Sequence, residues 1–478
     1  MTESAPMEQV ANAPKFHKDR SHYGAALGRW FAMQRPHASG VRVSGIDIPA
    51  ATGFSNETVF FDVDWIEGAN AHQQRFVARI EPPTGALFPA QTAACRVSVR
   101  LQYQAMELAA AHGVPMCPLV GFEADTAVLG QPFFVMGFVE GVIPADVPRY
   151  SEAGFLVDDA TPEERTRMVR TGLQAMAKVH AIDWREAGLE WLDVSGSGQP
   201  TQAVQLERYR DFVTEQLAGR EHPVMFQALD WLDANDPHDE RVGFTWGDAR
   251  LGNIIWSGYE PVVVCDWEAC ALSPTEADIG WWLMFDRMSF DDLGATRMEG
   301  FPTREQMIAM YEQASGREVR NAHYWEVFGA VRFAAIMIVL MDRMVDAGLV
   351  PAVINMAIAN PVTDAVARLL GIENPTPPLV LEWAGRSSCR PLRRYCWERA
   401  APPWRGRSAQ RTAGQRGKAS RLATRRGSHG REVGGARHLD GRAVRAGGNR
   451  RARRRHRRVL CRERGAARSV RRPHGCRA

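Results

Sequence analysis

The chain is poor in cysteine, and its cysteines are not grouped. Four of the eight lie near the C-terminus, and the other four, Cys95, Cys117, Cys265 and Cys270, show no metal-ligand spacing. The start of the chain, Met1 to Ser4, lacks the basic residues and the apolar run of a secretory signal. We therefore expect no cysteine-ligated metal, and a protein of the reducing cytoplasm.

Long apolar runs are also missing. The longest one, from Phe333 to Met341, is bounded by Arg332 and Asp342. It is far shorter than the roughly 20 residues that span a bilayer. We expect a buried helix at this place and no membrane partner.

Acidic residues are scarce in the last part of the chain. From Ala384 onward there are 30 Lys+Arg but 4 Asp+Glu, and no Ile, Phe or Met. The whole chain has 59 basic and 55 acidic residues, so residues 1–383 hold 29 and 51, a net charge of −22 against +26 for the tail. A segment with so few large apolar side chains cannot bury a core.

Two interpretations of this tail remain open. Runs such as Arg450 to Arg455 suit a basic arm that binds nucleic acid or an anionic surface. Alternatively, the tail is a disordered segment read out of frame from a GC-rich gene, which would also be rich in Arg, Gly, Ala and Pro. We favour this second interpretation, since no aromatic residues that could stack on bases follow Trp404.

The most informative segment is a short loop that contains an aspartate and an asparagine. Asp248 precedes Asn253 by five positions, and Asp266 follows after an apolar run. In phosphoryl transfer the protein mainly positions the reactants and holds the metal that neutralises the developing charge. Magnesium prefers oxygen ligands and needs only one or two protein carboxylates. We therefore predict that Asp248 orients an acceptor hydroxyl and that Asn253 and Asp266 hold magnesium.

Each of these residues also has a plainer interpretation. Asp248 follows a glycine and could be an ordinary turn residue. The register of Asn253 and Asp266 favours the catalytic interpretation over that one. Glu268, two residues after Asp266, is either an orienting group or a solvated charge at the end of a strand.

Several motifs in order resemble the aminoglycoside phosphotransferase and choline kinase-like family, a small-molecule branch of the protein-kinase-like fold. The resemblance runs from about residue 50 to 372 and is greatest to the phosphotransferase subgroup that occurs alone or joined to acyl-CoA dehydrogenases. The motifs are the phosphate loop at Gly53 to Thr58, the cation-bearing strand at Phe76 to Arg79, the interlobe hinge at Pro132 to Gly141, a helix ending at Ala177 to His180, the catalytic loop with the Asp266 strand, and the helix start at Glu276 to Trp282.

The resemblance implies an α+β fold with two lobes, a small β-rich N-lobe over residues 21–137 and a larger, mainly helical C-lobe over 138–375. Residues 1–20 and 376–478 would be disordered. The implied cofactors are ATP and magnesium. Ser55 and Asn56 would contact the nucleotide from the phosphate loop, Arg79 would pair with its phosphates, and the backbone near Phe138 would meet the adenine.

The chain departs from the family pattern at three positions. Trp246 stands where the family usually has a histidine, which raises a question about the geometry of the loop. Arg79 replaces a lysine, and a guanidinium can pair with phosphate oxygens in a bidentate way. Gln102 stands where a glutamate is expected to pair with that cation, so we expect a neutral hydrogen bond between Gln102 and Arg79.

The patterning predicts the main elements. We expect strands at residues 59–65, 76–80 and 133–139, a helix at 97–111, and a strand pair at 254–256 and 262–265 that brings Asn253 and Asp266 together. Helices should begin after Thr161 and Thr303, which start capping motifs. We expect His180 to pack within the fold, Asp278 to brace the catalytic loop, and the tryptophans at 267, 281 and 282 to be core first and pocket wall second.

The acceptor is not determined by these motifs. The subgroup resemblance favours a small molecule of the hydroxyacyl or hydroxy acid type, and the wider family an aminoglycoside or macrolide. An alternative is a catalytically inactive nucleotide-binding scaffold. Nucleic acid would be a partner only through the basic tail.

Overall fold

The computed structural model describes residues 20–49, 56–83, 85–91, 98–146, 148–238, 241–292, 294–348 and 355–376. All of them belong to a compact unit that spans Met1–Arg405. The predictions for Ser55, for most of the phosphate loop, for the first 19 residues and for the basic tail lie outside the described residues.

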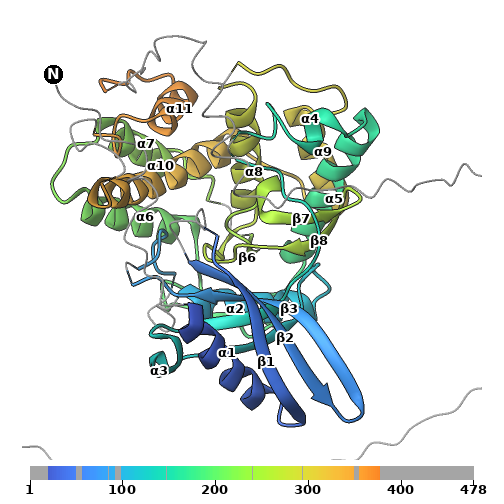
Figure 1. Cartoon of the computed structure of the whole chain (residues 1–478). Coiled ribbons are helices and arrows are strands. Elements are labelled where there is room, and N and C mark those ends of the chain that lie inside the picture. The colour runs from blue at the N-terminus through green and yellow to red at the C-terminus, as the bar shows by residue number, and fades with distance from the viewer. Residues whose placement is uncertain are drawn as a thin grey trace, which may run out of the picture. The chain divides into compact units, whose positions relative to one another are not determined.

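The first lobe is built on a five-stranded antiparallel sheet with the strand order β1-β2-β3-β5-β4 (Figure 1). The strands are β1 (Ala38–Asp47), β2 (Glu57–Glu67), β3 (Asn70–Ile80), β4 (Leu119–Glu123) and β5 (Phe133–Gly137). Three of these strands match the sequence predictions. Strand β5 ends at the predicted lobe boundary.

One face of this sheet packs against helix α1 (Arg20–Gln34). In β2 the side chains of Val59, Phe61 and Val63 are fully buried on this face, at alternate positions of the strand. The Trp30 and Phe31 rings of α1 complete the cluster. The sequence analysis did not predict α1, β1 or β4, although the buried residues Tyr23, Leu27 and Trp30 of α1 recur at helical spacing.

The other face of the sheet carries helix α2 (Ser98–Ala111), as predicted. Tyr103 of α2 packs on Phe134 of β5, with ring centroids 6.1 Å apart. The carboxylate of Glu81, at the end of β3, accepts the backbone N–H groups of Ser98 and Val99 at 3.0 and 2.8 Å. Strand β3 is therefore tied to the N-terminus of α2 through a side-chain cap.

The second lobe is mainly helical (Figure 1). Thr161 and Thr303 form the predicted capping boxes with Glu164 and Gln306. The α-helices of the second lobe are α4 (Phe155–Asp158), α5 (Pro162–His180), α6 (Gln202–Leu217), α7 (Pro223–Ala234), α8 (Glu276–Ser289), α9 (Arg304–Ser315), α10 (Ala322–Asp346) and α11 (Pro361–Leu370). The short helix α3 (Thr126–Leu129) lies between β4 and β5 of the first lobe.

Helix α10 is the centre of the second lobe. It contains the longest apolar stretch of the chain and contacts α6, α7, α8 and α11. Among the described helices, it alone is long and apolar enough to cross a membrane. However, 83% of its most apolar 18-residue stretch is buried inside the protein. The predicted buried helix is therefore confirmed as a core element.

Two short strand pairs interrupt the helices. β6 (Val242–Thr245) pairs with β9 (Ala271–Pro274), and β7 (Ile254–Ser257) pairs with β8 (Glu260–Val264), all antiparallel. The predicted pair at 254–256 and 262–265 is thus present. Together the sheet and the helices give the bilobal α+β fold that the sequence predicts.

Candidate active site

The predicted catalytic loop connects β6 to β7 and passes through a short 3₁₀ turn, Leu251–Asn253. Gly247 begins the loop with a φ of 90°. A Cβ atom added there would lie 2.0 Å from the carbonyl oxygen of Ala269. Only glycine fits, because both the positive φ and the close backbone contact exclude a side chain.

Asp278 of α8 holds the start of the loop through hydrogen bonds. Its carboxylate accepts the backbone N–H groups of Trp246 and Gly247 at 2.7 and 2.8 Å. The same carboxylate contacts His180 Nε2 at 2.9 Å, and His180 Nδ1 contacts the Tyr311 hydroxyl at 2.7 Å. Both side chains are almost fully buried. The predicted packing of His180 and the predicted bracing by Asp278 are confirmed.

Asp248 lies at the centre of the loop, with one carboxylate oxygen held by the protein. Its Oδ1 atom accepts the indole N–H of Trp281 at 2.8 Å and lies 3.3 Å from Arg250 Nε. The Asn253 side chain also hydrogen-bonds to this carboxylate. Burial raises the pKa of the Asp248 carboxyl, and the neighbouring Arg250 guanidinium lowers it in part. The side chain keeps 13% of its surface exposed.

Arg250 is a site residue that the sequence did not reveal. Its Nη1 atom donates to both carboxylate oxygens of Asp146, at 2.8 and 2.9 Å. Burial lowers the pKa of the guanidinium, but Asp248 and Asp146 raise it by more, so the group is firmly charged. In the sequence, only its position two residues after Asp248 pointed to this role. That position does not distinguish Arg250 from an ordinary surface arginine.

Asn253 lies beside Asp266, as the strand pairing predicted. The Asn253 carbonyl accepts the backbone N–H of Cys265 at 2.8 Å, which brings the two strand ends together. The Asn253 amide nitrogen donates to the Asp248 carbonyl at 3.0 Å. This bond fixes the orientation of the amide and leaves its oxygen available to a cation.

Asp266 has a left-handed backbone, with a φ of 53°. Its Oδ1 atom accepts Arg79 Nη2 at 3.1 Å, and Arg79 Nη1 donates to Thr58 Oγ1 at 2.9 Å. The first lobe thus places its predicted phosphate-pairing cation against the predicted metal-binding carboxylate of the second lobe.

The donor set fits magnesium. Asn253 and Asp266 offer one amide oxygen and one carboxylate, and such a hard cation commonly takes few protein ligands. Within the described part of the chain, no three His, Cys, Asp or Glu side chains gather into a metal-binding group. A cation at this place would take its other ligands from water and from a bound nucleotide.

Asn56 is the first described residue of the predicted phosphate loop. It is almost fully buried, and its amide nitrogen donates to Glu268 Oε2 at 3.4 Å. Glu268 is half-buried and accepts this hydrogen bond from the first lobe. The contact favours its interpretation as an orienting group.

Phe138 follows β5 at the connection between the lobes. Its ring is 38% exposed and lies edge to face with Phe60, with centroids 6.0 Å apart. Arg75 lies over both rings, and its carbonyl accepts the Phe138 N–H at 2.9 Å. That N–H is therefore occupied, and the Phe138 ring and carbonyl are the groups left to meet a ligand.

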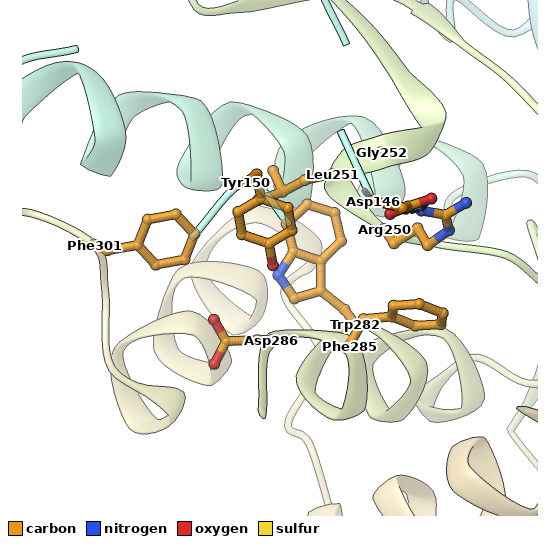
Figure 2. A pocket seen from close by; sticks show the side chains of 9 residues that line it. All are labelled: Asp146, Tyr150, Arg250, Leu251, Gly252, Trp282, Phe285, Asp286 and Phe301. Atoms are coloured by element: carbon orange, nitrogen blue, oxygen red, sulfur yellow. Dashed lines mark hydrogen bonds and ion pairs between the residues drawn. The ribbon is translucent and has the colours of Figure 1, made fainter. Parts of the chain in front are cut away.

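A small cavity lies next to the loop (Figure 2). Arg250 and Asp146 lie at one side of it, and Asp286 and Phe301 at the other. Its volume is about 10 Å³, the room of one water. Its wall contains four aromatic residues, Tyr150, Trp282, Phe285 and Phe301, together with the charged side chains of Asp146, Arg250 and Asp286.

The sequence profile of the Phosphotransferase enzyme family (APH) matches residues 48–318, more than half of the chain. This match contains the loop, Arg79 and Asp266. The chain belongs to this family.

Two relatives of this phosphotransferase are large proteins with other names. Acyl-CoA dehydrogenase family member 10 of Mus musculus is 25% identical over 267 residues, which are 53% of this chain and 23% of that one. The Arabidopsis thaliana protein "Probable acyl-CoA dehydrogenase IBR3" is 27% identical over 305 residues, 59% of this chain and 34% of that one. The chain thus spans about a quarter to a third of the length of these relatives.

A solved structure supports the fold of the phosphotransferase. A crystal structure from Ralstonia eutropha JMP134, named as an aminoglycoside phosphotransferase, has a TM-score of 0.51 and 23% identity. The comparison covers 72% of this chain and 94% of that one. This likeness confirms the kinase-like, bilobal arrangement.

The phosphotransferase keeps its loop geometry despite Trp246. The indole is fully buried, and its N–H donates to the Cys265 carbonyl at 2.7 Å. The ring thus ties the start of the loop to the residue before Asp266. The larger side chain supplies the donor and the packing that the loop needs.

The expected hydrogen bond between Gln102 and Arg79 is wrong. Gln102 Nε2 donates instead to Ser98 Oγ, one turn earlier in α2, at 3.0 Å. Arg79 is turned toward Thr58 and Asp266. The contact between β3 and α2 is made by the Glu81 carboxylate, so the helix no longer needs an ion pair with Arg79.

Proposed function

We propose that this phosphotransferase moves the γ-phosphate of ATP, with magnesium, to a hydroxyl group of a small molecule. The observation that carries this proposal is the convergence of Asp248, Asn253 and Asp266 around one loop, with Arg79 arriving from the other lobe. This set contains an acceptor-orienting carboxylate, oxygen ligands for a hard cation, and a cation for phosphates.

Each residue has a part in this reaction. Asp248 Oδ2 accepts a hydrogen bond from the acceptor hydroxyl and takes its proton as the oxygen attacks phosphorus. Asn253 and Asp266 hold the metal, which when bound offsets the charge on the phosphate oxygens. Arg79 pairs with the phosphates.

The remaining contacts concern the nucleotide. Asn56 and, by its position in the sequence, Ser55 belong to the predicted phosphate loop and would contact ATP there. The ring and carbonyl of Phe138 would meet the adenine.

We further propose an acceptor of the hydroxyacyl or hydroxy acid type. Arg250 puts a positive charge 3.3 Å from Asp248, which disfavours a cationic acceptor at that place. The relatives named as acyl-CoA dehydrogenases support an acyl acceptor as well.

A second acceptor class is an aminoglycoside or a macrolide. Asp146 and Asp286 also line the cavity, and carboxylates can bind the amino groups of such molecules. Arg250 and Arg297 already pair with these two carboxylates, which weakens this option.

The test is acceptor-dependent ADP release by the full chain with magnesium-ATP. The panel contains hydroxyacyl-CoAs, free hydroxy acids, aminoglycosides, macrolides, choline and homoserine. We expect turnover with a member of the first two groups, and none with Asp248→Asn. Turnover that survives Asp248→Asn would reject the mechanism, and turnover with an amino sugar alone would reject the acyl class.

The competing proposal is an inactive scaffold that only binds nucleotide. It predicts that ATP raises the melting temperature of the chain while no acceptor in the panel releases ADP. The intact set of Asp248, Asn253 and Asp266 argues against it. We also propose a cytoplasmic protein, since Cys117, Cys265 and Cys270 form no disulfide.

A further inference from the structure

Helix α10 contains a buried positive charge in an apolar setting. Arg332 is only 4% exposed and directly precedes the longest apolar stretch of the chain. Within the described residues no carboxylate pairs with it. Its Nη2 atom donates to the Gly247 carbonyl at 2.6 Å, and its Nε atom donates to the Tyr209 hydroxyl at 3.1 Å.

Burying an arginine without a carboxylate costs free energy that its contacts must offset. Part of the compensation comes from aromatic faces. The centre of the guanidinium lies 4.6 Å from the Trp281 ring centroid, and 5.7 and 5.8 Å from those of Phe328 and Tyr209. An apolar residue would fill this position of the core at lower cost, so the charge calls for another explanation.

The contacts of Arg332 lead to both sides of Asp248. On one side, the peptide groups of Gly247 are held twice, because Asp278 accepts the N–H and Arg332 donates to the carbonyl. On the other side, the Trp281 indole presents its face to Arg332 and its N–H to Asp248 Oδ1. The charged groups around this arrangement are Arg250, Asp266 and Asp278.

We propose that Arg332 and Trp281 are positioning residues for phosphoryl transfer. Together they fix Asp248 Oδ1, so that Oδ2 alone faces the acceptor hydroxyl. Arg332 acts through Gly247 and through the Trp281 ring, and touches no reacting atom. This inference rests on the proposed role of Asp248.

The kinetic test uses Trp281→Phe and Arg332→Met in the full chain, with magnesium-ATP and the panel acceptor of highest turnover. Trp281→Phe keeps an aromatic ring but removes the N–H donor and part of the buried ring system, which is why a second buried tryptophan serves as the control below. We expect each variant to lower kcat about ten-fold while KM for ATP stays within two-fold, since a looser carboxylate affects the chemical step. A rise in KM for ATP at unchanged kcat would overturn the proposal.

Matched controls separate positioning from general destabilisation. Trp30 is also a buried indole that donates to a carboxylate, Glu123 Oε2 at 3.1 Å, but it lies in the first lobe. Arg165 also holds backbone carbonyls, those of Leu156 and Glu299 among them. Trp30→Phe and Arg165→Met should leave kcat within two-fold. An equal loss in the controls would count against a positioning role.

A second readout does not depend on turnover. In full chain labelled with ¹⁵N-tryptophan, the indole N–H signal of Trp281 is the one lost in Trp281→Phe. We expect Asp248→Asn and Arg332→Met each to shift this signal, because the first weakens its acceptor and the second removes the cation from its ring. Trp30→Phe serves as the control and should leave it in place.

The two readouts distinguish the possible failures. If the indole signal responds as expected but no panel acceptor is phosphorylated, the positioning contacts stand and the proposed function fails. If turnover is normal in the wild type but the indole signal ignores Asp248→Asn, the positioning proposal fails. Arg332→Lys provides a second variant if Arg332→Met does not fold, and should lose less than ten-fold in kcat because it keeps the charge.

Discussion

The two sides of the candidate site are held in different ways. On the loop side, Asp278, Trp281 and Arg332 are nearly inaccessible, and each makes short hydrogen bonds to the loop. On the nucleotide side, the Arg79–Asp266 pair keeps 19% and 37% of its side-chain surfaces exposed. In the proposed reaction, Asp248 would therefore be fixed in advance, while Arg79 would be able to change partner on binding of a nucleotide.

The largest effect should come from Asp248→Asn. We expect a loss of about 10³-fold in kcat, typical for removal of a general base. Binding of ATP, followed by thermal shift, should be nearly unchanged because Asp248 does not reach the nucleotide side. Lost ATP binding would show that the two sides are not independent.

The next largest effect concerns Asp278, which holds the start of the loop through hydrogen bonds. Asp278→Asn removes one acceptor oxygen, so either a loop N–H or His180 loses its partner. We expect the free energy of unfolding to fall by about 2–3 kcal/mol, the cost of a buried unsatisfied polar group, and kcat to fall with it. Chemical denaturation and ADP release measure the two quantities.

Asp193→Asn is the matched control for this prediction. Asp193 is also buried in the second lobe and accepts the backbone N–H groups of Ser195 and Gly198. It should lose stability in a similar way but keep kcat. Equal loss of kcat in both variants would show that Asp278 affects turnover only through general stability and not by holding the loop.

On the nucleotide side, Arg79→Met should raise KM for ATP about ten-fold. Stability should change by less than about 1 kcal/mol, since the pair with Asp266 is partly exposed. Arg42→Met is the control, because Arg42 pairs with Asp64 at the same 3.1 Å distance on the same sheet. A large loss of stability in Arg79→Met alone would mean that this side is as rigid as the loop side.

The last prediction extends the comparison to the cavity and concerns stability alone. Burial raises the pKa of Asp286 to about 6, although Arg297 lowers it in part. The protonated form is thus favoured in the folded state. Its contribution to stability is present below about pH 4, the usual value of an unfolded aspartate, and is lost as the pH rises through about 6.

The comparison with Asp286→Asn isolates this contribution, because asparagine does not titrate. Between pH 4 and pH 7 the wild type should lose about 2 kcal/mol relative to the variant. Melting temperatures of both proteins across this range measure the difference. A difference that stays constant with pH would contradict the shifted pKa.

The sequence predicted the elements whose signals are local. The capping boxes at Thr161 and Thr303 and the strands around Phe76 and Phe133 appear where expected. Helix α1 and strands β1 and β4 were missed, although the apolar residues of α1 recur at helical spacing. The error at Gln102 has a different origin, because alignment with a motif could not show that Glu81 caps α2.

The sequence by itself determined that Asp248, Asn253 and Asp266 come together, since their spacing follows from the local path of one loop and one strand pair. Only the tertiary structure decided what holds them. Trp281 and Arg332 follow Asp248 by 33 and 84 positions in the chain, and in sequence they looked like a core tryptophan and the boundary of an apolar run. Hydrogen bonds and ring contacts between such distant residues depend on how helices α8 and α10 pack, which no local pattern records.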